Sequence, residues 1–116
     1  ETLVKKMATR AKAKGTNFVV LVIPSKEFVF HQYLADSGNR LPDVYNKMAE
    51  AEQRLRKQVF NWLESESIPY ADAAPEVLNA LKEKGSIYPA DNDGHPLGRG
   101  YQAYADAAYK AFFKPQ

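Results

Sequence analysis

Apolar residues recur along this chain at two different spacings, and the spacing changes near its start. Regular steps of four in a basic stretch predict a helix over residues 2–14, capped by Gly15. Residues 18–23 are instead six consecutive apolar residues, rich in β-branching, and Pro24 ends the run. An unbroken apolar run predicts a central parallel strand that is covered on both faces. The apolar stripe of the helix consists of Leu3, Met7 and Ala11.

Helical spacing returns in the middle of the chain. Residues 25–42 predict a short helix or an irregular excursion followed by a loop, and residues 43–64 predict a long amphipathic helix with Pro42 near its first turn. Residues 68–73 predict a second short strand, and a further helix ends at Gly85. The expected stripe of the long helix is Val44, Met48, Ala51, Leu55, Val59 and Leu63, with Arg54, Arg56 and Lys57 among the charges on its outer faces.

A last amphipathic helix is expected after Pro96, with a stripe formed by Leu97, Tyr101, Tyr104, Ala105, Ala108 and Phe112. The order helix, strand, helix, strand, helix, helix predicts an α/β fold with parallel strands. A central strand needs neighbours that pair its N–H and C=O groups and layers that cover its two apolar faces, and a sheet of two strands does not supply them. We therefore expect residues 1–116 to be part of a larger α/β domain, with the missing neighbours in absent residues or in a partner chain. A half-sheet of this kind could also pair with itself.

Composition narrows the classes of function. The chain has 16 Lys and Arg against 14 Asp and Glu, and this net charge of +2 argues against a nucleic-acid partner. The absence of cysteine excludes disulfides, thiolate metal sites and a cysteine nucleophile. No apolar run approaches the ~18 residues of a membrane span. A basic cluster near the start fits either a solvated helix face or a phosphate-binding patch; it consists of Lys5, Lys6, Arg10, Lys12 and Lys14.

Candidate chemistry lies in the loop "DNDGHPLGRG" at residues 91–100. Asp93 and His95 stand two apart, so one tight turn can place the carboxylate on Nδ1 and leave Nε2 free to accept a serine proton. Gly94 between them is expected to provide a backbone conformation that a larger residue would resist. The alternative is a helix cap beside a surface histidine. A metal site that adds Asp91 is a further alternative, although only one other histidine exists.

The stretch from residue 88 to residue 113 resembles the final block of the SGNH (GDSL-type) hydrolases, in which an Asp and a His complete a Ser-His-Asp triad before the last helix. "FVVLVIPSKEFVF" resembles the strand and Pro-X-Lys turn of SGNH-like cell-envelope proteins related to alginate and other polysaccharide O-acetyltransferases. "IPYADAAPEVLNAL" resembles the next strand and helix. The resemblance implies the C-terminal portion of a three-layer α/β/α, flavodoxin-like fold, with no cofactor and a location in the periplasm or cell envelope.

The nucleophile block of that family is not identified in this chain. Ser37 in "ADSGN" does not follow a strand directly, so we do not assign it as the nucleophile. Ser25 is better placed, but it occupies the variable middle of the Pro-X-Lys turn. Lys26 could place a cation near an oxyanion or a sugar carboxylate, or could simply extend from the end of the strand.

The remaining polar and aromatic candidates have structural interpretations. His31 has no carboxylate near it in sequence and is interpreted as structural or exposed. Asp72 follows the second strand and is interpreted as a helix cap, with a contact to the active site as the alternative. Tyr101, Tyr104 and Tyr109 are interpreted as packing residues rather than substrate platforms, and Trp62 is also interpreted as a packing residue.

The resemblance implies acyl transfer from an ester, such as an O-acetyl group of a carbohydrate or envelope polymer, to water or to a sugar hydroxyl. His95 would then act as general base and general acid, Asp93 would orient it, and absent residues would supply the serine. The competing hypothesis is a carbohydrate-binding or structural domain that keeps the fold and lacks catalysis.

Overall fold

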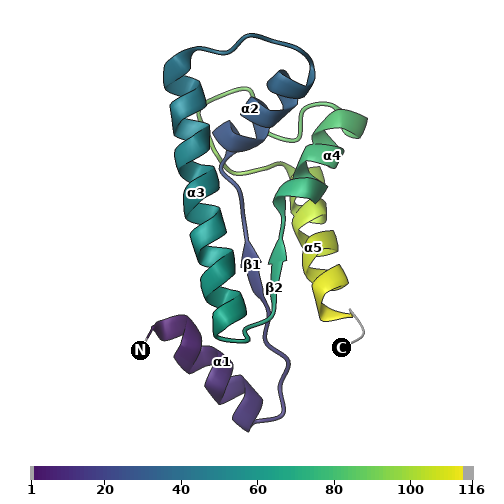
Figure 1. Cartoon of the computed structure of the whole chain (residues 1–116). Coiled ribbons are helices and arrows are strands. Elements are labelled where there is room, and N and C mark those ends of the chain that lie inside the picture. Colours follow the sequence, from purple (N-terminus) through teal and green to yellow (C-terminus); the bar gives the residue numbers. More distant parts are fainter. Residues whose placement is uncertain (1, 114–116) are drawn as a thin grey trace.

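A computed structural model describes residues 2–113 of the chain, with the Lys84 side chain left out. The chain has a mixed α/β fold that is mostly helical and contains a small sheet of two parallel strands (Figure 1). In chain order its elements are α1 (Leu3–Ala13), β1 (Val20–Val22), α2 (Lys26–Asp36), α3 (Asp43–Ser65), β2 (Tyr70–Asp72), α4 (Ala74–Lys84) and α5 (Gly98–Phe112).

The two strands pair in parallel, with Leu21 opposite Ala71. The N–H of Val20 donates to the carbonyl of Pro69 at 2.9 Å, and the N–H of Ala73 donates to the carbonyl of Val22 at 3.0 Å. Both strands point toward α2, while α1 lies beyond their amino ends (Figure 1). The helices α2 and α3 form the connection between the strands, as parallel pairing requires a long crossover.

Local sequence explains where the helices begin and end. The Thr2 hydroxyl accepts the N–H of Lys5 at the start of α1, and the Ser25 hydroxyl accepts the N–H of Phe28 at the start of α2. Gly85 has a φ of 73° at the end of α4, a left-handed conformation that favours glycine. The predicted ends of the first and fourth helices are confirmed.

The main core lies between the sheet and the three helices α2, α4 and α5. Val77 and Leu81 of α4 are buried as predicted, and Leu78 packs against the core while half-buried. The fully buried Ile87 and Tyr88, which follow α4, extend this core toward α5. The remaining buried members of this cluster are Val29, Ala71, Ala73, Ala80, Ala103, Tyr104 and Ala107.

The sequence interpretation of α3 is wrong about which face is covered. Its buried residues are Ala49, Arg56 and Leu63, which stand seven apart and therefore share one face. Of the predicted stripe only Leu63 is buried, while Leu55 is 62% exposed. Arg56, expected on an outer face, is only 6% exposed. The apolar stripe and the core-facing stripe are adjacent on the helix, and periodicity alone selected the more hydrophobic one.

Two further expectations about apolar positions, those for β1 and α5, are corrected. β1 is not a strand covered on both faces, because its residues are half-buried and β2 is its one strand neighbour within residues 2–113. The helix α1 contains no buried residue, so its apolar stripe does not enter the core. The helix α5 buries Gly100, Ala103, Tyr104 and Ala107, a face rotated from the predicted one, and it leaves Leu97 49% exposed.

Candidate active site

The Asp93–His95 turn has the geometry that its spacing predicts. One carboxylate oxygen of Asp93, Oδ1, accepts the backbone N–H of His95 at 2.9 Å and lies 2.6 Å from Nδ1 of the same residue. The preceding Asp91 accepts the N–H of Asp93 in the same way, also at 2.9 Å. Two consecutive side-chain-to-backbone turns therefore orient the imidazole and direct Nδ1 toward the carboxylate. The His95 side chain is 82% exposed, which leaves Nε2 on the solvent side.

The same contacts favour the ionised carboxylate. The hydrogen bond from the His95 backbone N–H, followed by the one from its side chain, lowers the pKa of Asp93 below the usual value. Asp93 therefore remains an anion at neutral pH. A permanent carboxylate on Nδ1 stabilises an imidazolium that forms when Nε2 takes a proton.

Gly94 does not have the role expected of it. Its φ lies outside the left-handed region, and a Cβ built on it would meet no atom within 4 Å. The turn is shaped by the carboxylates of Asp91 and Asp93, so the glycine is not needed for its conformation. Gly100 is the glycine that packing requires, because an added Cβ would collide with the Pro96 side chain at the start of α5.

Lys26 is brought to this loop from the other half of the chain. Its ammonium donates to the carbonyls of Pro89 at 2.9 Å, Asp91 at 2.8 Å and Asp93 at 3.1 Å. Since Lys26 opens α2 just beyond β1, these bonds place the Asp93 backbone at the carboxyl end of β1. The loop between α4 and α5 runs across the molecule at that end of the sheet (Figure 1). In parallel α/β sheets this is the edge where ligands bind.

Asp72 lies at the carboxyl end of β2, one residue before the N-cap Ala73, and binds the first residue of α4. Its Oδ1 accepts the N–H of Ala74 at 2.8 Å. The same atom pairs with Arg56, whose guanidinium lies 5.3 Å from the ring centroid of Phe28 and 5.4 Å from that of Phe60. Sequence reasoning missed Arg56, although its step of seven from Ala49 and Leu63 was a signal that it shares their face.

The serines considered from the sequence have other partners. The Ser25 hydroxyl donates to Glu52 at 2.5 Å while it caps α2. The Ser37 hydroxyl donates to the carbonyl of Tyr33 at the far end of α2. Within residues 2–113, neither serine is hydrogen-bonded to His95.

The other candidates are mostly structural. His31 Nε2 lies 2.9 Å from Asn46 Oδ1, and its ring packs edge-on against Tyr45, so its structural interpretation is confirmed. Packing describes the buried Tyr104 well, but Tyr101 and Tyr109 are 51% and 64% exposed. Across the described part of the chain, no three His, Asp or Glu side chains converge as metal ligands.

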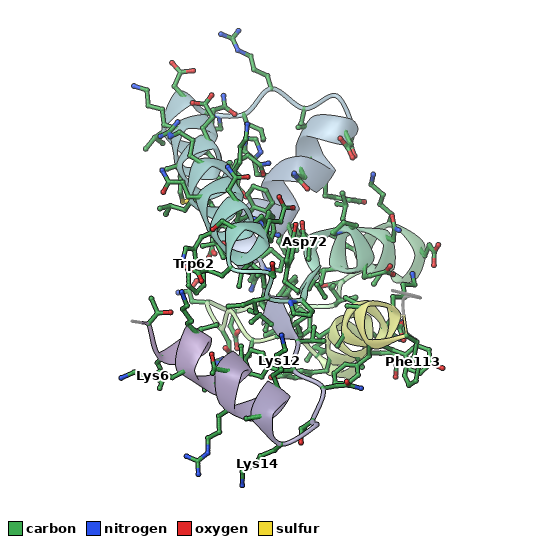
Figure 2. The ribbon with its side chains drawn as sticks, turned by 60° about the horizontal axis from the view of Figure 1, so that its bottom comes forward. Lys6, Lys12, Lys14, Trp62, Asp72 and Phe113 are labelled. Carbon is green, nitrogen blue, oxygen red and sulfur yellow. The ribbon has the colours of Figure 1, made fainter. Side chains whose placement is uncertain are left out.

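A groove of about 1250 Å³ lies away from this turn, between α1 and α5. Its lining includes Phe18, Val19 and Ala71, and neither Asp93 nor His95 contributes to it. Lys12 borders this groove, whereas Lys6 and Lys14 extend away from the body of the chain (Figure 2). Lys5 forms an ion pair with Glu66 at 2.5 Å. The basic cluster is therefore divided between a groove wall, an ion pair and solvent.

No known protein family, characterised protein or solved structure matches this chain. None of the helices described over residues 2–113 is long and apolar enough to cross a membrane.

Proposed function

We propose that this chain supplies the aspartate and the histidine of a Ser-His-Asp acyl-transfer site that acts on esters, such as acetyl esters of carbohydrates or envelope polymers. The observation that carries the proposal is the Asp93 carboxylate 2.6 Å from His95 Nδ1, with the imidazole exposed at the carboxyl edge of two parallel strands. An acid that orients a base in this way is the arrangement that activates a hydroxyl nucleophile.

The chemistry assigns one proton path to His95. Nε2 accepts the proton of the serine hydroxyl while the serine oxygen bonds to the acyl carbon. The imidazolium then donates that proton to the departing alkoxide oxygen as the ester C–O bond breaks. In the second half the same nitrogen deprotonates water or a sugar hydroxyl, whose oxygen bonds to the acyl carbon. The acyl–serine C–O bond then breaks, and the imidazolium returns the proton to the serine oxygen. Asp93 stays ionised throughout, and the proposal requires no cofactor.

The proposal assigns the serine to residues outside this chain. Ser25 is engaged as a cap and by Glu52, which argues against it as the nucleophile. We propose that β1 and β2 belong to a larger parallel sheet in a three-layer SGNH-type fold, whose additional strands carry the serine. The partly covered β1 supports this part of the proposal, because parallel strands occur almost only in sheets with both faces covered. Pairing of two copies through an edge of this sheet remains an alternative way to extend the sheet.

The test is hydrolysis of p-nitrophenyl acetate by the protein that unites this chain with the proposed serine segment. His95→Ala is expected to lower kcat by about 10²- to 10⁴-fold, because it removes the general base. Asp106→Asn, a change to an exposed carboxylate on α5, serves as the control and is expected to have no effect. The 116 residues alone are expected to show no hydrolysis that depends on His95. Full activity of His95→Ala would refute the proposal.

The second candidate function is carbohydrate binding without catalysis. It is favoured by the exposed Tyr101 in the first turn of α5, six residues after His95, where an aromatic ring can pack against a sugar. Calorimetry with an acetylated polysaccharide distinguishes the two. Binding that Tyr101→Ala abolishes, without release of acetate, would favour this candidate over the esterase.

A further inference from the structure

The ammonium of Lys26 makes more contacts with the loop than a substrate-binding role requires. It donates to three backbone carbonyls, those of Pro89, Asp91 and Asp93, at 2.8 to 3.1 Å. An ammonium has three N–H groups, so this set uses all of them. The charge also lies 5.7 Å from the ring centroid of Tyr88, which is 1% exposed. The side chain thus ends inside a cage formed by the loop itself.

The cage needs a cation at its centre. The three carbonyls belong to alternate residues, so the backbone from Pro89 to Asp93 curls around a single point. Carbonyl oxygens carry partial negative charge and repel one another when they converge, unless a cation lies between them. This stretch contains no helix or strand that would fix its backbone. The charge of Lys26 therefore stabilises the shape of the loop, together with the carboxylates of Asp91 and Asp93 that bind its backbone N–H groups.

We propose that Lys26 is a positioning residue, whose ammonium fills the carbonyl cage and holds the Asp93–His95 turn at the carboxyl end of β1. This is an alternative to the sequence hypothesis that Lys26 contacts an oxyanion or a substrate carboxylate, since a substrate would have to displace a loop carbonyl to reach the ammonium. We call this contact of the Lys26 ammonium with the three carbonyls the clamp. Its role in catalysis rests on the proposed function, whereas the clamp itself is a property of the loop.

Lys26→Met tests the clamp, since it keeps the length of the side chain and removes the charge. Lys82→Met is the matched control, because Lys82 is a surface lysine whose ion pair is with Asp36 on α2. The readout is amide hydrogen exchange at Asp93 and His95, together with the imidazole nitrogen signals of His95. In Lys26→Met we expect both amides to exchange roughly tenfold faster, as charge-assisted hydrogen bonds that order the loop are lost. We also expect the NMR signal of the proton on Nδ1 of His95 to disappear.

Two further variants keep the test decisive if Lys26→Met folds poorly. Lys26→Ala leaves an open cage, and ammonium ion at high concentration is expected to restore slow exchange at His95, whereas tetramethylammonium, which donates no hydrogen bond, is not. Lys26→Arg retains the charge, but its planar guanidinium cannot direct three protons from one nitrogen to three carbonyls, so we expect partial loss of protection.

The outcomes separate the clamp from the proposed function. Wild-type exchange and wild-type imidazole signals in Lys26→Met would overturn the clamp, whatever the activity. A loosened loop that ammonium restores would support the clamp even if the protein with its serine segment showed no esterase activity, and only the proposed function would then fail. A fall in kcat of that protein with an unchanged loop would return Lys26 to direct substrate contact and reject the positioning role.

Discussion

Removing Asp72 is expected to destabilise the chain far more than removing its partner Arg56. The two side chains form an ion pair in which Arg56 is 6% exposed and Asp72 is 34% exposed. Asp72→Ala strands a buried guanidinium without its anion, which costs about 3–5 kcal/mol in comparable cases. It also removes the acceptor of the Ala74 N–H, a hydrogen bond worth about 1 kcal/mol.

Arg56→Met leaves a different situation. The methionine side chain can still pack between the rings of Phe28 and Phe60, which the guanidinium contacts at present. Asp72 is then unpaired, but it keeps solvent contact and the Ala74 N–H. The charge left behind is partly exposed, so Arg56→Met strands no buried ion, and we expect a loss of about 1 kcal/mol or less.

Urea denaturation followed by circular dichroism measures both changes. We expect the free energy of unfolding to fall at least about 2 kcal/mol further in Asp72→Ala than in Arg56→Met. The double variant should recover part of the loss, because it contains no stranded charge. The exposed pair of Lys82 and Asp36 is the control, and its removal should cost about 0–1 kcal/mol. Equal losses in the two single variants would refute the reasoning that burial of Arg56 decides the cost.

Three other predictions concern packing and titration. Gly100→Ala should lower the melting temperature, with a loss of about 1–3 kcal/mol from overpacking at the start of α5, and an unchanged melting curve would contradict the close approach. Leu63→Ala should cost about 2–5 kcal/mol in urea denaturation, whereas Leu55→Glu should stay within about 0.5 kcal/mol, because only Leu63 is buried. The pKa of the Asp93 carboxyl, measured by carbon NMR, should lie below its usual value of 3.8. Its contribution to stability is therefore present above pH 3.8 and is lost as the pH falls through the lower pKa of the folded state. His95→Ala should raise the pKa of Asp93.

Local chemistry was predictable from the sequence where neighbouring residues decide it. The Asp93–His95 contact depends on a spacing of two residues, and the bond between Asp72 and the first residue of α4 depends on the place of Asp72 between a strand and a helix. The positive φ of Gly85 follows from its position after α4 in the same way. These features need no knowledge of the rest of the fold.

The features that were missed depend on contacts between distant segments. Arg56 is buried because Asp72 and two aromatic rings surround it; its step of seven from Ala49 and Leu63 indicates a shared face but does not identify these partners. Lys26 reaches a loop more than sixty residues away. An apolar run such as residues 18–23 indicates that a strand can be covered, but it does not say whether the covering element is present.

The parallel pairing of Val20 with Tyr70 has a kinetic consequence. Fifty positions separate the two residues, so the sheet can form only after the intervening chain has closed a large loop. Folding rates fall as contacts become more distant in sequence, and the helical segments in between can form within their own neighbourhoods. We therefore expect the helices to form before the sheet during folding, with the pairing of the two strands as the slow step.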